Sequence, residues 1–211
     1  MRAALLILPF LFFLAGCLSN QAFTDKDVEN PCSIVTVDDI SAICGSSNME
    51  GVPFFVDYRS QNTIIGSSGY LISKCDFQKI GSGTSVAGES CTASNCTKLV
   101  VAKSPLVEVV YSPVADLSYE EFKLSLANDV SAIMPVNITI EKENLGFGDS
   151  SIIARASSQD GKGNEIETMV LAVYKGESSI LVNSRQNIEN KCFSEEKVRK
   201  IAELAISKLT K

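Results

Sequence analysis

The chain has 211 residues and carries 25 acidic against 19 basic residues, a net charge of −6 at pH 7. An acidic chain without a run of Lys and Arg is poorly suited to bind phosphate backbones, which argues against a nucleic-acid partner. The sequence contains no histidine, which excludes Ser-His-Asp and Cys-His nucleophiles and any histidine-ligated zinc or iron.

The N-terminus combines Arg2, an apolar run from Ala3 to Phe13, and the tetrapeptide Leu14-Ala15-Gly16-Cys17. Because the run is too short to cross a bilayer core of about 30 Å, it predicts a cleaved signal peptide over residues 1–16. The tetrapeptide resembles the lipobox of bacterial and archaeal lipoproteins, whose cysteine is alkylated with a diacylglycerol-type lipid. The resemblance implies an extracytoplasmic protein held to the cell membrane by a lipid on Cys17. An ordinary secretory signal is the alternative.

A polar stretch follows the signal, and the first helix is predicted after it. Residues 17–31 have hardly any apolar periodicity and predict a tether, which leaves residues 32–211 as a single domain. Thr36 followed by acidic residues predicts an N-cap, and Gly45 predicts the end of the helix at about Cys44.

The next part of the chain predicts strands separated by clusters of small residues. Strands are expected over Val52–Tyr58, Gly69–Ile80 and Lys98–Tyr111, and Pro105 requires an edge, a bulge or a break in the last of these. Residues 81–97 are small and polar, which predicts a long loop or a hairpin excursion.

The C-terminal half predicts further hairpins between two helices. A capping box at Ser118–Glu121 starts one helix, which Pro135 ends, and Ser194 starts a second that runs to about Leu209. Between them, four strands are expected: Val136–Glu143, Ile152–Ser157, Glu165–Lys175 and Ser178–Ser184. The order predicts an α+β fold, a mainly antiparallel sheet covered by N- and C-terminal helices.

Six further cysteines follow Cys17: Cys32, Cys44, Cys75, Cys91, Cys96 and Cys192. An even number in an exported domain favours three disulfides, which leaves fifteen possible connectivities. A thiolate metal site is the alternative, but such sites usually contain a C-x2-C pair, which is missing here. The sequence therefore predicts neither a metal nor a cofactor.

Several short motifs resemble a family of small extracytoplasmic lipoproteins of unknown function, best known from actinobacteria. Asn30–Thr36 is similar to the family's Pro-Cys-Ser-Leu-Leu-Thr opening, Cys75-Asp76-Phe77 to its second cysteine in a strand, and Leu145–Asp149 to its Gly-Leu-Gly-Asp turn. Val170 to Val182 resembles its final hairpin. The resemblance implies a PsbP-like α/β/α sandwich.

The resemblance also implies a first disulfide, Cys32–Cys75. Proximity in the sequence favours Cys91–Cys96. Elimination then leaves Cys44–Cys192.

Several motifs that suggest chemistry have simpler interpretations. Gly146-Phe147-Gly148-Asp149 is favoured as a tight turn, with Asp149 accepting local backbone N–H groups, over an anion-binding nest. Ser194 and Lys197 match a Ser-x-x-Lys nucleophile, but helix capping is favoured. The acidic pairs Asp38-Asp39 and Glu120-Glu121 stand in first helical turns, where they are stabilised without catalysis.

Two further features concern the surface. Phe54-Phe55-Val56 is predicted to be a buried strand under the N-terminal helix, with an exposed partner-binding patch as the alternative. Asn95 and Asn137 begin N-glycosylation sequons, whose use depends on the source organism and for which chance occurrence is favoured.

These observations favour a binding module that holds a small-molecule ligand or an envelope protein, rather than an enzyme. A structural or accessory subunit of a cell-surface complex is the alternative, and a histidine-free hydrolase is the least favoured. A buried carboxylate pair in a cleft would support the hydrolase. Recognition is expected on the sheet and on the loops at residues 59–69 and 81–97.

Overall fold

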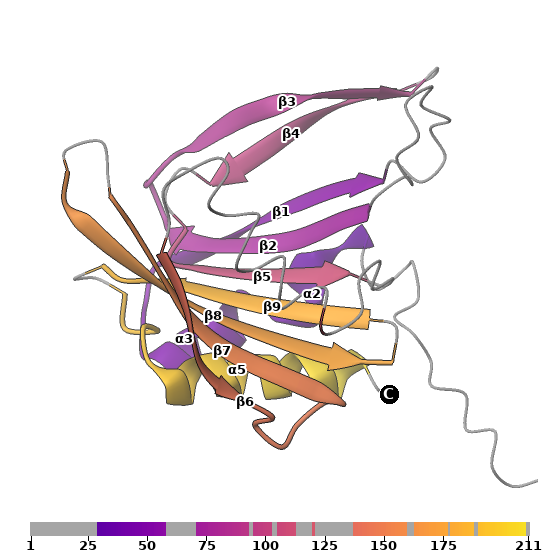
Figure 1. Ribbon diagram of the computed structural model, residues 1–211. Helices are drawn as coiled ribbons and strands as arrows, with labels where there is room; N and C mark the ends of the chain where they lie inside the picture. Colours follow the sequence, from indigo (N-terminus) through magenta and orange to yellow (C-terminus); the bar gives the residue numbers. More distant parts are fainter. Residues whose placement is uncertain are drawn as a thin grey trace, which may run out of the picture.

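The computed structural model describes residues 29–57, 71–92, 95–102, 105–112, 120, 137–159, 163–176, 178–187 and 190–209. These residues form a seven-stranded sheet in the order β1-β2-β5-β9-β8-β7-β6 and a separate two-stranded hairpin, β3-β4. Every neighbouring pair of strands is antiparallel. Figure 1 shows the hairpin beyond the β1 edge of the large sheet and α5 at the opposite end.

The described helices are α2 (Pro31–Ile34), α3 (Val37–Cys44) and α5 (Glu195–Leu209). The strands are β1 (Met49–Asp57), β2 (Leu71–Lys79), β3 (Thr84–Thr92), β4 (Asn95–Ala102), β5 (Val107–Ser112), β6 (Asn137–Glu143), β7 (Ser150–Gln159), β8 (Glu165–Lys175) and β9 (Ser178–Arg185). The mainly antiparallel sheet and the C-terminal helix predicted from the sequence are therefore confirmed.

The structure refines two of the predicted segments. The strand expected over Lys98–Tyr111 breaks at Pro105 into β4 and β5, which belong to different sheets. Residues 81–97 were predicted to be a long loop or a hairpin excursion, and the described residues among them form a turn, β3 and the start of β4, which is a hairpin. The loop at residues 59–69 lies outside the described residues. So does the helix expected after Ser118, apart from Glu120, which is helical.

One face of the large sheet forms the hydrophobic core. Residues directly opposite one another on neighbouring strands share a face. A fully buried row therefore crosses the sheet from β2 to β7: Cys75, Val109, Val182, Leu171 and Ile153. The same core contains Ile34 and Val35, Ile40 of α3, and the inner side of α5. Residues of all three described helices thus belong to the same hydrophobic core as this first face of the sheet.

Complementary charges hold α3 and α5 together. Thr36 and Asp39 form a reciprocal capping box at the start of α3, and Gly45 ends that helix in the left-handed conformation at φ 63°. Lys208, near the end of α5, pairs with Asp39 at 2.6 Å, and Lys197 donates to the Cys44 carbonyl at 3.4 Å. Cationic groups near helix C-termini and anionic groups near N-termini are stabilised by the helix dipole.

Two disulfides fix the N-terminal segment to the rest of the fold. Cys32–Cys75 joins α2 to β2, and Cys44–Cys192 joins the end of α3 to the turn before α5 across 148 residues. Four of the six cysteines after Cys17 are therefore not available as thiolate ligands. Cys91 and Cys96 are directly opposite each other in the β3-β4 register. Cα atoms of opposite residues lie about 4.5–5.5 Å apart, which a disulfide can bridge, so Cys91–Cys96 stays a prediction.

Candidate functional site

The second face of the sheet has a mixed polar and apolar character. One row across it reads Phe54, Lys74, Val110, Leu181, Ala172 and Ile152, and the next reads Asp76, Glu108, Asn183, Val170, Ala154 and Ile140. Ile152, Ala154 and Ala172 in these rows are fully buried, whereas Val110 and Leu181 are half-buried. None of the three described helices lies on this face.

At the β2 end of this face, six side chains form a polar group that we call the acceptor cluster: Glu50, Lys74, Asp76, Gln78, Glu108 and Asn183. The Lys74 ammonium pairs with Glu108 and lies 3.1 Å from Asp76 Oδ2. Asn183 Nδ2 donates to Glu108 Oε2 at 2.9 Å, and Gln78 Nε2 donates to Glu50 Oε1 at 2.9 Å. The side chains of Asp76 and Gln78 are fully buried.

Each donor side chain of the acceptor cluster makes at least one hydrogen bond or ion pair, but several acceptor atoms make none. Asp76 Oδ1, Gln78 Oε1 and Asn183 Oδ1 are buried, and none accepts a hydrogen bond from any residue that the structure describes. A buried acceptor without a donor costs about 1–3 kcal/mol, and such atoms in native structures commonly mark the site of a water, an ion or a ligand. The cluster therefore presents unsatisfied oxygen atoms from two strands.

Burial and neighbouring charges shift the ionisation of this cluster. Burial, with the adjacent Glu108 carboxylate, raises the pKa of Asp76 to about 6. Burial also raises the pKa of Glu108, but the Lys74 ammonium and the Asn183 amide outweigh it and hold that pKa below its usual range. Asp76 is thus the group of this pair that keeps a proton in mildly acidic solution.

We expect Asp76→Asn to change the pH dependence of stability. Because the pKa of Asp76 is higher in the folded chain than its ordinary 3.8, the folded state binds more protons between about pH 4 and pH 6. Wild-type stability should therefore fall, relative to the variant, as the pH rises through this window, by up to about 3 kcal/mol. Urea unfolding at pH 4, 5, 6 and 7 measures this difference.

Asp38→Asn serves as the control, since it removes an exposed carboxyl on α3. It should leave the wild-type pH profile in place. If the stability of wild type and of Asp76→Asn changed with pH in the same way, the raised pKa of Asp76 in the folded chain would be contradicted.

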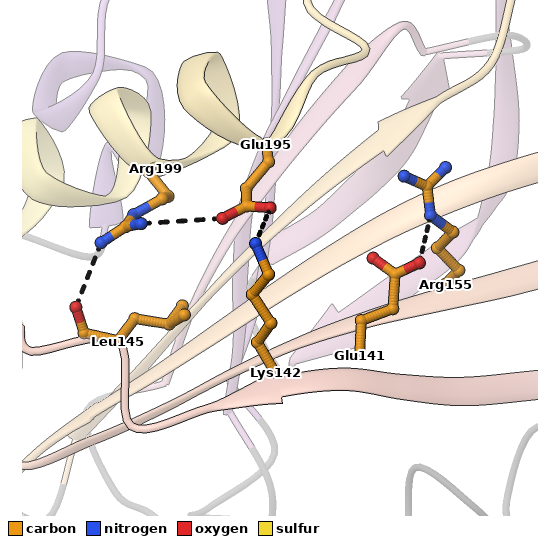
Figure 2. A network of polar contacts seen from close by, with 6 residues as sticks. All are labelled: Glu141, Lys142, Leu145, Arg155, Glu195 and Arg199. Atoms are coloured by element: carbon orange, nitrogen blue, oxygen red, sulfur yellow. Dashed lines mark hydrogen bonds and ion pairs between the residues drawn. The ribbon is translucent and has the colours of Figure 1, made fainter.

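A second polar network lies where α5 meets the β6 edge of the sheet (Figure 2). Lys142 pairs with Glu195 at 2.6 Å, and Arg199 contacts Glu195 at 3.6 Å and donates to the Leu145 carbonyl at 3.1 Å. Arg155 pairs with Glu141, the extra residue of the β6 bulge, at 2.5 Å. Since each cation shown has an acidic or carbonyl partner, this network fastens the edge strand and its loop to α5.

A hollow of about 450 Å³ lies along the same helix and is lined by Glu195, Glu196, Arg199, Lys200 and Glu203. Lys200 and Glu196 pair within the helix at 2.6 Å. Intrahelical pairs of this spacing stabilise a helix by a few tenths of a kcal/mol. The α5 network is therefore a weaker candidate for a binding site than the acceptor cluster.

The Gly146-Phe147-Gly148-Asp149 segment is a turn, with both glycines at positive φ. The partner of Asp149 differs from the prediction, because its carboxylate accepts the distant Gly176 N–H at 2.6 Å rather than a local one. Asp149 N–H also donates to the Tyr174 carbonyl at 2.7 Å. The turn is thus tied to the β8-β9 hairpin by hydrogen bonds that only the tertiary fold creates.

Two other motifs also have structural roles. Ser194 Oγ accepts the Lys197 N–H at 3.4 Å as a helix cap, while Lys197 Nζ donates to the carbonyls of Cys44 and Lys191. Asp39 belongs to the α3 capping box. The Ser-x-x-Lys match and this acidic pair therefore stabilise helices.

Phe54-Phe55-Val56 was predicted to be a buried strand under the N-terminal helix, but Phe54 and Phe55 are both half-buried and lie on opposite faces. A strand alternates its side chains, so Phe55 packs against the core while Phe54 lies on the second face. The Lys74 ammonium lies 5.5 Å from the centre of the Phe54 ring. Phe54 therefore borders the acceptor cluster.

The acceptor cluster was not predicted from the sequence. Its only sign in the sequence is the polar–apolar alternation of Lys74-Cys75-Asp76-Phe77-Gln78, which is typical of any half-exposed strand. The register of β2, β5 and β9 is needed to bring Asp76, Glu108 and Asn183 together.

Some predicted site residues are not tested by this geometry. Cys17 lies outside the described residues, and the side chains of Cys91, Cys96, Asn95 and Asn137 are not described. Within the described part of the chain, no group of three or more His, Cys, Asp or Glu residues is placed to hold a metal ion. No described helix is long and apolar enough to cross a membrane.

Comparison of the chain with protein-family models, with curated proteins and with solved structures found no match.

Proposed function

We propose that this protein is an extracytoplasmic lipoprotein that binds a ligand or an envelope partner through the second face of its sheet. The observation that carries the binding role is the acceptor cluster, where unsatisfied buried oxygens adjoin half-buried apolar side chains. Binding sites typically combine an apolar lining with a few polar groups that fix orientation.

The location is proposed from Leu14-Ala15-Gly16-Cys17, which resembles a lipobox. The two disulfides support export, since such bonds persist mainly in oxidising compartments. A diacylglycerol-type group on Cys17 would supply the membrane attachment, because each buried CH₂ contributes about 0.8 kcal/mol. We also propose a PsbP-like fold, with the first face of the sheet covered by N- and C-terminal helices, as the finer description of the fold.

The hydrolase alternative rests on the only carboxylate pair that the described residues bury on this face, Asp76 and Glu108. The Lys74 ammonium contacts both carboxylates, so neither is free to act as a general acid or base. A general acid and base must reach the reacting bond directly or through one water. The arrangement therefore supports binding more than hydrolysis.

Affinity isolation from the native membranes tests the proposal. Wild type, Val110→Gln on the second face and Glu203→Gln on the outer side of α5 are compared, with mass spectrometry of co-purifying proteins and small molecules. We expect Val110→Gln to lose a component that wild type and Glu203→Gln retain. Thermal unfolding of each variant checks that the fold is intact.

Cys17→Ser supplies the second arm of this experiment. Without the thiol no lipid can be attached, so the variant should be unprocessed or leave the membrane fraction after a high-salt wash. Normal cleavage with full membrane retention of Cys17→Ser would contradict the lipoprotein assignment. An identical set of co-purifying components for all folded variants would contradict the second face as the binding surface.

A further inference from the structure

The buried atoms of the acceptor cluster that lack a hydrogen-bond partner are all acceptors. Lys74, Gln78 and Asn183 are its donor side chains, and each already donates to Glu50, Asp76 or Glu108. The three buried atoms left over, Asp76 Oδ1, Gln78 Oε1 and Asn183 Oδ1, are all acceptors. A complementary ligand must therefore bring N–H or O–H groups.

The charge balance of the cluster favours a cation. Glu50, Asp76 and Glu108 are three acids against the single base Lys74. Buried carboxylates without an opposite charge are costly, so a second positive group would stabilise the site. The cluster already binds one ammonium, that of Lys74, between Asp76 and Glu108.

Two of the free acceptors lie on one strand and one face. Asp76 and Gln78 are alternate residues of β2 on the same face, which places their backbones about 7 Å apart. An ammonium nitrogen has three N–H donors and no acceptor, so it complements a site whose free atoms are acceptors. An organic body is favoured over a bare metal ion, because Val52 and Phe54 border the cluster on β1, and the described residues offer no set of three acidic, Cys or His ligands.

We propose that the acceptor cluster binds the primary ammonium group of an organic amine between Asp76 and Gln78. This inference rests on the proposed binding role of the second face and gives the chemical class of its ligand. Lys74 keeps its place beside Glu108 and neutralises that carboxylate. The added ammonium then satisfies the acceptors on β2.

Calorimetric titration of the mature protein in detergent with putrescine tests this proposal. The matched probe is 1,4-butanediol, which has the same chain length with hydroxyl groups in place of the two ammonium groups. Calcium chloride at equal ionic strength forms the third arm. We expect saturable binding of putrescine and none of butanediol or calcium. Equal binding of butanediol, binding of calcium alone, or no binding of putrescine would overturn the proposal.

Variants assign the binding to the cluster. Gln78→Leu, which removes one of the two acceptors, should weaken putrescine binding at least tenfold. Glu203→Gln on α5 should not change the affinity. Unchanged affinity in Gln78→Leu, or an equal loss in Glu203→Gln, when thermal unfolding shows both variants folded, would contradict the site.

The two proposals fail in different ways. Suppose that calorimetry shows no putrescine binding, but that affinity isolation from native membranes finds a component that Val110→Gln loses. The amine inference would then be wrong, and the binding role of the second face would stand. Putrescine binding with no such component would support the site and limit its role to small amines.

Discussion

Gly148→Ala is expected to destabilise the protein by about 3–4 kcal/mol. Gly148 has φ +69°, and a Cβ atom there would lie 2.5 Å from Val173 Cγ1 and 2.6 Å from the Tyr174 carbonyl oxygen. The carbonyl is backbone of β8 and cannot move aside without breaking its ladder. The cost therefore combines left-handed strain with a collision, and chemical unfolding of wild type and variant measures it.

Gly146 provides a matched control within the same turn. It has φ +86°, but a Cβ atom added there would meet nothing within 4 Å. Gly146→Ala should therefore cost only the left-handed strain, about 1 kcal/mol. Equal losses for both variants would contradict the close contact between this turn and β8.

Removing the Cys44–Cys192 disulfide is the second large expected effect. The double variant Cys44→Ala/Cys192→Ala opens a loop across 148 residues, for which the chain-entropy model gives about 5 kcal/mol. Both cysteines are also buried in the core, so the truncation adds a packing loss. Denaturant unfolding under non-reducing conditions should show a large loss of stability or an unfolded chain at 37 °C.

Cys32→Ala/Cys75→Ala is the comparison. It opens a loop across only 43 residues, and the same model gives about 1 kcal/mol less stabilisation. Peptide mapping without reduction tests the pairing itself and also shows whether Cys91 and Cys96 are joined. A smaller effect for the longer loop would contradict the entropic explanation.

Local signals predicted most of the elements. The β8 bounds Glu165–Lys175 follow from composition between turn residues, and the α3 bounds follow from Thr36 and Gly45. Such signals act within a few residues and need no knowledge of the fold. Local signals cannot predict the strand order, because β5 lies between β2 and β9 and these strands are distant from one another in the sequence.

The candidate site depends on that distant pairing. Asp76 and Glu108 are 32 positions apart in the sequence, and only the β2-β5 register brings them opposite each other. Asp149 shows the same limit on a smaller scale: its turn was predictable from two glycines, but its bond to Gly176 was not. Acidic residues that are adjacent in the sequence can be identified as pairs without the fold. One of them, Asp39, is part of a helix cap and not of a site.

Site-specific photo-cross-linking in native membranes tests the central claim most directly. A photoreactive amino acid is placed at Leu181 on the second face, at Glu203 on the outer side of α5, or at Ile80 in the exposed turn before β3. We predict a cross-linked species from Leu181 in the membrane fraction and none from Glu203. Cross-links from Glu203 or Ile80 with none from Leu181 would contradict binding through the second face of the sheet.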